Sequence, residues 1–473
     1  MNNNIMKIEQ IYTGCLAQGA YYIESNGEVA IIDPLREVDQ YIKKAKNDEA
    51  AIKYIFETHF HADFVSGHVT LAEKTGASIV YGPTAKTSFE AIVAKDKEVF
   101  NVGEITITAL HTPGHTMEST TYLLKDKEGN DHAIFSGDTL FLGDVGRPDL
   151  AQKGDFTQED LAGMLYDSLR TKIMPLADEV IVYPAHGAGS ACGKNLSKET
   201  VGTIGDQKKT NYALRTDMTK EEFIEEVTDG LLPPPAYFPL NVKMNKNGYQ
   251  SIDDVIKNGS RALSVNDFEK IANETDAIVL DVRHQFEFIK GFIPQSIFIG
   301  LGGTFAPWVG ALIKDVTQPI LLVTPVGEES TTITRLSRVG FDNVLGYLDG
   351  SFESWKSSGK DIDTLRSVTA NDLEEALNNK AKVFDARRPG EYDNEHIVNV
   401  PSTPLDFLND YVKDFPVNED FYIHCAGGYR SVIAASILKA RGYHNVIDVA
   451  GGYRAIKETN IERTVEVCPS TLK

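Results

Sequence analysis

Histidine and aspartate residues with the spacing of metal ligands occur in the first half of the chain. In Thr58-His59-Phe60-His61-Ala62-Asp63 they follow the apolar run 51–56 directly. This run predicts a short buried strand, and side chains two residues apart on extended backbone point to the same side. We therefore expect His59, His61 and Asp63 to leave one strand end together. Imidazole and carboxylate groups are ligands for zinc or iron(II).

Three further polar motifs complete a set of candidate ligands. Each follows a short apolar run that predicts a strand, so these ligands would also lie at strand ends. The motifs are His111-Thr112-Pro113-Gly114-His115, Ser136-Gly137-Asp138-Thr139 and Pro184-Ala185-His186-Gly187. In this order, the four motifs resemble the metallo-β-lactamase superfamily over roughly the first half of the chain. The resemblance implies a four-layer αβ/βα sandwich.

Phe64 departs from the pattern of the binuclear hydrolases of that superfamily, which carry a metal-binding histidine directly after the aspartate. A phenyl ring cannot bind a metal ion, so a complete second site is not expected. The resemblance then implies a mononuclear site with His59, His115 and Asp138 as ligands and one Fe(II) per chain. Two imidazoles and one carboxylate are the ligand set of non-haem Fe(II) oxygenases.

The other residues of the motifs are expected to surround these ligands. They would fix the ligand tautomers and contact bound water; they are His61, Asp63 and His186. For His186 the alternative is a vestigial ligand without a present role. Spacing alone does not distinguish iron from zinc, so the choice of iron rests on the resemblance and on Phe64.

Three longer segments narrow the resemblance. Residues 140–149, 186–194 and 203–212 are similar to the persulfide dioxygenase branch, whose members oxidise a thiol persulfide, RSSH, to sulfite and thiol. We expect Arg147 and Asp149 to pair at the rim of the metal site. Cys192 is a candidate accessory thiol for persulfide sulfur near the iron, and the alternative is a packed small residue in a glycine-rich turn.

An internal repeat fills the remainder of the chain. Residues 278–283 return as 382–387, and residues 344–352 return as 446–453. Strands separated by helical runs predict a parallel α/β sheet in each unit. Both units resemble rhodanese domains, which are sulfurtransferases. The expected domains are a dioxygenase domain over 1–250, a rhodanese-like domain without the catalytic cysteine over 251–365, and an active rhodanese domain over 366–473.

The second unit carries a cysteine loop between a predicted strand, 421–424, and a predicted helix, 432–439. Converging backbone N–H groups, the helix dipole and the arginine of the loop all favour the thiolate. The loop matches the C-x-x-G-x-R-S form of active rhodaneses, with Cys425 as the persulfide carrier. Its members are Cys425, Ala426, Gly427, Gly428, Tyr429, Arg430 and Ser431.

The first unit has no thiol at the matching loop, Thr324 to Ser330. Glu328 and Glu329 lie where an anion would have to bind, and carboxylates raise the energy of an anion there. We therefore expect a non-catalytic spacer.

Composition limits the classes of partner. A net charge of −21 over 473 residues disfavours nucleic acid and anionic membrane surfaces. No apolar signal core and no run long enough to span a bilayer occur, and four cysteines make no disulfide framework. A cytoplasmic enzyme with free thiols is expected; the thiols are Cys15, Cys192, Cys425 and Cys468.

The whole layout resembles persulfide dioxygenase–rhodanese fusions of bacterial sulfide detoxification. The resemblance implies a low-molecular-weight thiol persulfide, O2 and sulfite as substrates, thiosulfate as product at Cys425, and a homodimer or homotetramer. Glutathione, coenzyme A, cysteine and bacillithiol all stay open as the carrier thiol. Two alternatives are a glyoxalase II-like thioester hydrolase with a fused sulfurtransferase, and a non-catalytic sulfur carrier.

Overall fold

The computed structural model describes residues 6–150 and 156–467. The chain divides into two compact units. Unit 1 comprises Met1–Ile252 with Ser337–Gly340, and unit 2 comprises Asp253–Leu336 with Phe341–Lys473. Unit 2 therefore contains both copies of the internal repeat.

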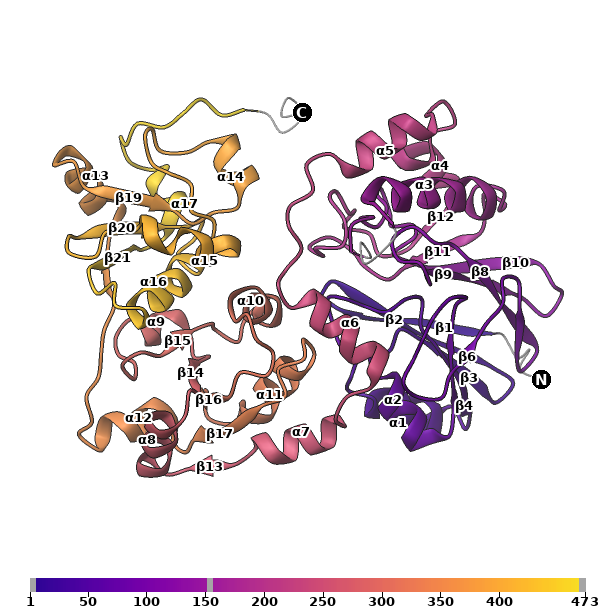
Figure 1. Ribbon diagram of the computed structural model, residues 1–473, viewed down its shortest axis with the longest axis horizontal. Coiled ribbons are helices and arrows are strands. Elements are labelled where there is room, and N and C mark those ends of the chain that lie inside the picture. The colour runs from indigo at the N-terminus through magenta and orange to yellow at the C-terminus, as the bar shows by residue number, and fades with distance from the viewer. Residues whose placement is uncertain (1–5, 151–155, 468–473) are drawn as a thin grey trace. The chain divides into compact units, whose positions relative to one another are not determined.

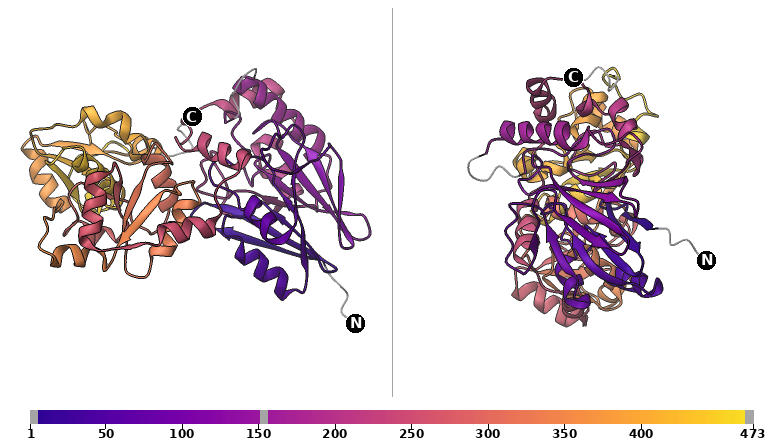
Figure 2. Two further views of the ribbon diagram at one scale, coloured as in Figure 1. Left: turned by 60° about the horizontal axis from the view of Figure 1, so that its bottom comes forward. Right: turned by 90° about the vertical axis from the view of Figure 1, so that its right-hand side faces the viewer.

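Unit 1 is built on two six-stranded sheets (Figures 1 and 2). The first has the order β1-β2-β3-β4-β5-β6 and the second the order β12-β11-β10-β9-β8-β7. The strands of the first sheet are β1 Lys7–Thr13, β2 Gln18–Ser25, β3 Glu28–Ile32, β4 Ala51–Phe56, β5 Ser78–Tyr81 and β6 Ile92–Val93. Those of the second are β7 Val99–Val102, β8 Ile105–His111, β9 Thr120–Lys125, β10 Asp131–Gly137, β11 Ile181–Pro184 and β12 Gly202–Thr203.

Helices cover the outer face of each sheet (Figure 1). α1 Asp39–Asn47 and α2 His68–Thr75 lie against the first sheet, where Tyr41 and Leu71 join its outer core. The second sheet is covered by α3 Gln158–Ser168, η1 Leu169–Ile173, α4 Ile204–Thr210, η2 Tyr212–Leu214 and α5 Lys220–Thr228. α3 and α5 each begin with a threonine capping box, at Thr157 and Thr219, which satisfies backbone N–H groups of the first turn. The last helix of unit 1 is α6 Phe238–Asn247.

A separate apolar layer lies between the two sheets of unit 1. Its aromatic members include Tyr21, Phe56, Phe100, Tyr122 and Phe135, all buried. Together with the two outer cores, this layer makes the four-layer αβ/βα sandwich and confirms the predicted fold class. An Asn26-Gly27 hairpin turn joins β2 and β3, and both residues have positive φ (47° and 80°).

Unit 2 contains two parallel sheets, one for each copy of the repeat (Figure 1). The first copy has the strand order β13-β17-β16-β14-β15 and the second the order β18-β21-β20-β19. The first copy comprises α7 Ile252–Gly259, β13 Ala262–Leu263, α8 Val265–Glu274, β14 Ile278–Asp281, α9 Gln285–Phe288, β15 Ile297–Phe298, α10 Phe305–Leu312, β16 Ile320–Val323, α11 Glu329–Ser337, β17 Val344–Leu348 and α12 Ser351–Ser357.

The second copy repeats this alternation of strands and helices. It comprises β18 Arg366–Val368, α13 Ala370–Asn378, β19 Lys382–Asp385, α14 Pro389–Asn394, η3 Leu405–Phe407, α15 Leu408–Tyr411, η4 Val412–Asp414, β20 Phe421–His424, α16 Arg430–Ala440, β21 Val446–Val449 and α17 Gly452–Ile456. Gly350 and Gly451 occupy the same place in the two copies: each has a left-handed backbone and precedes the last helix of its copy. All pairings within both sheets are parallel, as the sequence pattern predicts.

Within the described residues, no helix combines the length and the apolar character that a membrane crossing requires. Cys15, Cys192 and Cys425 are free thiols, and Cys468 lies outside the described residues.

Candidate metal centre and thiol site

The loops that follow β4, β8 and β10 bring His59, His115 and Asp138 together. Asp138 Oδ2 lies 3.3 Å from His115 Nε2 and 3.8 Å from His59 Nε2, and all three residues are buried. Ligand atoms about 2.1 Å from a common ion lie about 3.0–3.4 Å apart, so the cluster is close to that geometry. The three residues form one of the groups in the chain that could hold a metal ion.

Hydrogen bonds to Nδ1 turn Nε2 of both histidines toward Asp138. His59 Nδ1 lies 3.0 Å from Thr58 Oγ1, and Thr58 Oγ1 donates to Asp33 Oδ2 at 2.8 Å. The threonine oxygen therefore accepts a hydrogen from His59 Nδ1. His115 Nδ1 lies 2.8 Å from the carbonyl oxygen of Arg147 and donates to it. Both Nε2 atoms are left as free bases, which metal binding requires.

The charge state of the cluster also fits a cation. Both oxygens of Asp138 are buried and lack a hydrogen-bond partner in the described part of the chain. A buried carboxylate without a partner is costly unless a cation binds it. Burial, and then the neighbouring His61, His115 and His186, lower the pKa of His59 well below its usual range, so its imidazole is neutral. The residues present thus fit a bound divalent metal ion.

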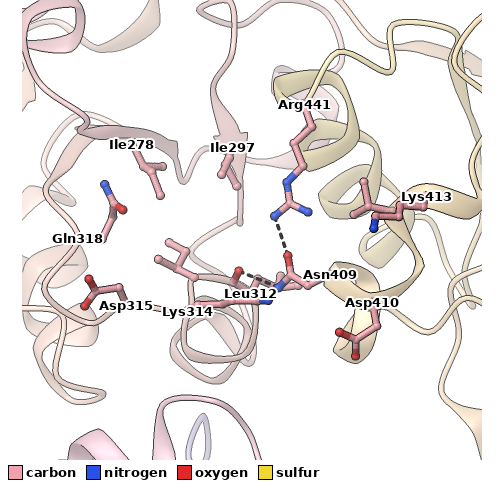
Figure 3. A pocket seen from close by; sticks show the side chains of 12 residues that line it. Ile278, Ile297, Leu312, Lys314, Asp315, Gln318, Asn409, Asp410, Lys413 and Arg441 are labelled. Carbon is pink, nitrogen blue, oxygen red and sulfur yellow. Dashed lines mark hydrogen bonds between the residues drawn. The ribbon is translucent and has the colours of Figure 1, made fainter.

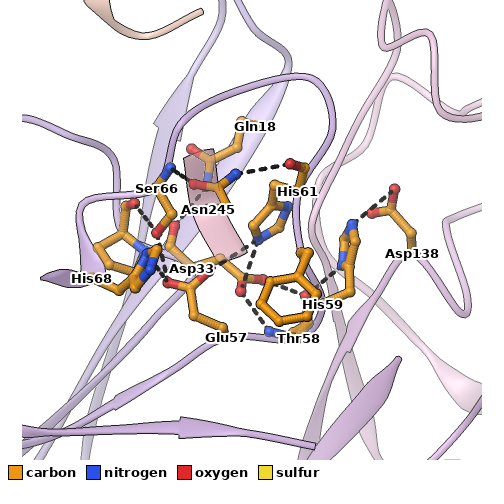
Figure 4. A network of polar contacts seen from close by, with 12 residues as sticks. Gln18, Asp33, Glu57, Thr58, His59, His61, Ser66, His68, Asp138 and Asn245 are labelled. Atoms are coloured by element: carbon orange, nitrogen blue, oxygen red, sulfur yellow. Dashed lines mark hydrogen bonds and ion pairs between the residues drawn. The ribbon is translucent and has the colours of Figure 1, made fainter. Parts of the chain in front are cut away.

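His61 lies outside this group, against a different set of carboxylates (Figure 4). Its Nε2 lies 3.0 Å from Asp33 Oδ1 and 3.7 Å from Glu57 Oε2. Although burial opposes it, Asp33 and then Glu57 raise the pKa of His61 to about 9. The rings of His59 and His61 lie side by side, with centroids 4.2 Å apart, and His61, Asp63 and His186 form a second buried group that could hold a metal ion. The backbone after Phe56 bends and does not keep the extended form expected from the sequence.

Asp63 and His186 form the neighbouring part of the site. His186 Nε2 lies 3.6 Å from both Asp63 Oδ2 and Asp138 Oδ1, and neither His186 Nε2 nor Asp63 Oδ1 has a hydrogen-bond partner in the described residues. Cys192 belongs to the same cluster and is buried. Burial, and then Asp63 and Asp138, raise the pKa of Cys192 well above its usual range. Cys192 is therefore a neutral thiol in this environment.

The rim of the site is held by Arg147. Its guanidinium makes two hydrogen bonds of 2.6 Å to Asp149, which is the pairing expected from the sequence. The same side chain donates to the carbonyl of Leu232, and the backbone N–H of Arg147 donates to Cys192 O. Through its backbone, Arg147 thus accepts a hydrogen bond from His115 Nδ1 and donates one to Cys192, so it links this ligand to the loop that carries Cys192.

Phe64 directly follows Asp63 in the sequence and packs against His61. It is fully buried, and its ring centroid lies 4.4 Å from that of His61. Asn245 of α6 donates to the carbonyls of His61 and Phe64, at 2.8 Å each, and accepts from Ser66 N. The segment from His61 to Ser66 is therefore held by a residue of α6 that lies 181 residues after Phe64 in the sequence.

The residues that orient the ligands were not predicted from the sequence. Asp33, Thr58 and Glu57 are buried polar groups around the metal cluster, and Asp33 follows β3 directly. His68 is the first residue of α2 and is buried. The available signals were the polar Asp33 after an apolar strand and the threonine directly before His59.

The cysteine loop of the second copy lies between β20 and α16. Cys425 is buried, and its Sγ accepts a hydrogen bond from Gly428 N at 3.1 Å. Ser431 Oγ lies 3.5 Å from the same sulfur. Arg430 makes bonds of 2.6 and 2.8 Å to Glu391, and although burial opposes it, these bonds lower the pKa of Glu391. The loop thus holds a sulfur atom at a strand end with a donor directed at it.

Tyr429 and Ser436 connect this loop and α16 to the first copy. Tyr429 Oη donates to the carbonyl of Gly300 at 2.8 Å, and Ser436 Oγ accepts from Phe298 N at 2.9 Å. In the first copy itself, Glu329 Oε1 accepts from Gly327 N at 3.0 Å. A carboxylate of the chain therefore takes an N–H group of the loop that would otherwise face an anion.

A cleft of about 650 Å³ also lies between the two copies (Figure 3). Ile278 and Ile297, at the first residues of β14 and β15, form part of its wall. Arg441 crosses it to Asn409, which donates to Leu312 O. None of the candidate site residues lines this cleft, so the cleft is separate from the functional site.

Both halves of the chain match known protein families. The family model of the metallo-beta-lactamase superfamily matches residues 13–186, and that of the rhodanese-like domain matches residues 264–358 and 369–459. The crystal structure titled metallo-beta-lactamase from Staphylococcus aureus subsp. aureus COL is 30% identical, with a TM-score of 0.65, over 73% of this chain and 99% of that one. The chain belongs to the metallo-beta-lactamase superfamily.

Curated relatives of this superfamily enzyme match the metallo-beta-lactamase domain. The probable hydroxyacylglutathione hydrolase glo2 of Schizosaccharomyces pombe is 33% identical over 205 residues, 38% of this chain and 75% of that protein. A second probable hydroxyacylglutathione hydrolase of the same yeast, SPCC13B11.03c, is 32% identical over 167 residues. This match spans 34% of the chain and 60% of the length of that relative.

Proposed function

We propose that the metallo-beta-lactamase domain oxidises low-molecular-weight thiol persulfides with O2 to sulfite and thiol. The observation that carries the proposal is the buried ligand group of His59, His115 and Asp138, together with Phe64, which follows Asp63 directly and cannot bind a metal ion. The ion that suits two imidazoles and one carboxylate with open positions is Fe(II), one per chain. The chemistry that this ion supplies when bound is the activation of O2 toward a sulfur substrate.

The residues of the chain position the site. Asp33 acts through Thr58, and the Arg147 carbonyl acts directly, to hold the two histidines with Nε2 inward. His61 Nε2 lies 3.0 Å from Asp33 Oδ1, so this imidazole is bound to a carboxylate beside the three proposed ligands. The neutral Cys192 thiol adds no competing thiolate to the pocket. We infer from this that Cys192 contacts the persulfide as a packing group and weak donor.

The rhodanese-like half would use the sulfite. Cys425 would take the outer sulfur of a second persulfide and pass it to sulfite, so that thiosulfate forms. The support for this role is the buried sulfur with the Gly428 N–H group directed at it, and the absence of a cysteine from the loop of the first copy. Fusion of the two activities raises the effective concentration of sulfite near Cys425.

A second candidate is thioester hydrolysis of the hydroxyacylglutathione hydrolase type, which the names of the curated relatives favour. That reaction would use two metal ions and a bridging hydroxide. Phe64 argues against it, because a phenyl ring that directly follows Asp63 cannot bind a second metal ion.

Metal analysis of the purified full chain and of two variants tests the proposal. We expect about one iron per chain in the wild type, and loss of both iron and O2 uptake in Asp138→Ala, because a ligand is lost. Asp217→Ala is the matched control: it removes an exposed, ion-paired carboxylate of unit 1 that is not a ligand, and should retain iron. An Asp138→Ala protein with full iron and activity would refute the ligand assignment. Two zinc ions per wild-type chain would favour the hydrolase.

A further inference from the structure

The second rhodanese-like copy contains a buried polar chain behind its cysteine. Ser431 Oγ, 3.5 Å from Cys425 Sγ, donates to Asp448 Oδ1 at 2.6 Å. The other oxygen of Asp448 accepts from Ser367 Oγ at 2.9 Å. Asp448 lies on β21 and is 2% exposed. A sulfur atom, a hydroxyl group and a carboxyl group thus lie in series within the protein interior.

Comparison of the two copies shows which of these residues are present only in the copy that has the cysteine. The strand pairing Ile423↔Asp448 corresponds to Leu322↔Tyr347 in the first copy, and Ser367↔Asp448 corresponds to Ala262↔Tyr347. The copy without the cysteine therefore has Thr324, Tyr347 and Ala262 in place of Cys425, Asp448 and Ser367. A carboxylate needed only to hold the fold would be expected in both copies, whereas this one is present only where the thiol is.

We propose that Asp448 is a positioning residue that exchanges a proton with Cys425 through the hydroxyl of Ser431. The proposal rests on the sulfurtransferase role of Cys425 given above. Ser431 can serve either direction, because a hydroxyl group both donates and accepts. When Cys425 is a thiol, its hydrogen faces Ser431 Oγ and the hydroxyl donates to Asp448. When the sulfur is a thiolate, protonated Asp448 donates to Ser431, and the hydroxyl donates to the sulfur.

The proton movements balance over one cycle. In loading, Cys425 Sγ attacks the outer sulfur of RS–SH, the S–S bond breaks, and RS⁻ leaves and takes a proton from water. The Sγ proton passes through Ser431 to Asp448. In discharge, the sulfur of sulfite attacks the outer sulfur of Cys425–S–SH, and the electron pair of the broken bond goes to Sγ. Asp448 returns its proton through Ser431, and thiosulfate loses its remaining proton to water.

The environment of Asp448 suits this exchange. Burial raises the pKa of Asp448 to about 6, so the carboxyl group can hold a proton closer to neutral pH than an exposed one. The groups that face it from α16 and β18 are the uncharged Ser431 and Ser367. The charged and titratable groups around the cysteine loop are Asp385 of β19, Arg387, His424 of β20, Glu391 of α14, Arg430 of α16 and Arg454 of α17.

Single-turnover kinetics of the full chain test the proposal. Cys425 is first loaded with glutathione persulfide, the gain of one sulfur atom is verified by mass spectrometry, and sulfite is then mixed in across pH 6 to 8.5. We expect wild-type discharge to slow as pH rises through the titration of Asp448. In Asp448→Asn we expect discharge at least about 10-fold slower at pH 6, with the difference closing by pH 8.5. Ser431→Ala should behave in the same way, and the double variant should be no slower than either single variant.

Alkylation of the unloaded protein gives a second readout. Removing a buried negative charge near the sulfur eases ionisation of the thiol, so the pH midpoint of Cys425 alkylation should fall by about one pH unit in Asp448→Asn. Asp420→Asn, an exposed ion-paired aspartate before β20, is the matched control and should change neither readout. Discharge by Asp448→Asn at the wild-type rate at pH 6, or equal slowing at pH 6 and pH 8.5, would overturn the proposal. Failure of wild-type Cys425 to accept sulfur would instead refute the proposed function.

Discussion

Asp448→Asn should stabilise unit 2 at neutral pH. The carboxyl group has an ordinary pKa of 3.8, and burial raises this pKa to about 6 in the folded chain. Each tenfold difference in proton affinity between the folded and unfolded states is worth 1.36 kcal/mol. Keeping Asp448 ionised therefore lowers the free energy of unfolding by about 3 kcal/mol at pH 7.5. Asparagine has nearly the same shape, can accept from one serine, and carries no charge to bury.

The sign of the pH dependence follows from the same shift. A raised folded-state pKa means that the folded protein binds the proton more tightly than the unfolded chain does. The free energy of unfolding therefore falls as pH rises from 3.8, the ordinary pKa, to about 6, the pKa in the folded chain. The advantage of Asp448→Asn should be about 3 kcal/mol at pH 7.5 and about half of that at pH 5.

Tryptophan fluorescence during urea unfolding measures this prediction. The only two tryptophans of the chain, Trp308 and Trp355, both belong to unit 2. Asp420→Asn serves as the control, because an exposed ion pair is worth less than about 1 kcal/mol. Destabilisation at pH 7.5, or the same gain at pH 5 and pH 7.5, would refute the reasoning from burial.

Three further substitutions test other parts of the site. Cys425→Ser should leave O2 uptake intact and change the product from thiosulfate to sulfite, as measured by chromatography of the sulfur anions. Thr58→Val should weaken metal binding by about 10- to 100-fold in a chelator competition, because His59 Nδ1 loses its partner, whereas the exposed Thr171→Val should not. Tyr429→Phe should destabilise unit 2 by about 1–3 kcal/mol in the fluorescence assay, because the carbonyl of Gly300 loses its donor.

Each of these predictions has a clear contrary result. Undiminished thiosulfate from Cys425→Ser would place sulfur transfer elsewhere in the chain. Unchanged metal affinity in Thr58→Val would mean that the histidine needs no orienting hydroxyl. An unchanged unfolding curve for Tyr429→Phe would mean that the first copy does not brace the cysteine loop.

The sequence predicted those features that depend on local pattern. Apolar runs located β4, β8, β10 and β11, and the polar residues that follow them are the ones that meet in unit 1. The predicted helix at 432–439 appears within α16. The repeat was recognisable because its strand motifs and glycine turns recur in the same order.

Features that depend on distant partners could not be predicted. Asp33 orients His59 only because β3 and β4 pair side by side, which places Asp33 next to Thr58. The direction of His61 depends on a bend after Phe56 and on Asn245 in α6, and neither follows from alternation along a strand. Asp448 resembles an ordinary strand residue until its pairing with β18 and α16 shows that it is buried behind Cys425.

Two substrates given in parallel to the same metal-loaded protein test the central claim most directly. Oxygen uptake is recorded with glutathione persulfide, and thioester cleavage is recorded with a hydroxyacyl glutathione. A single iron at His59, His115 and Asp138 predicts rapid O2 uptake with the persulfide and no thioester cleavage. Thioester cleavage without any uptake of O2 would contradict the account.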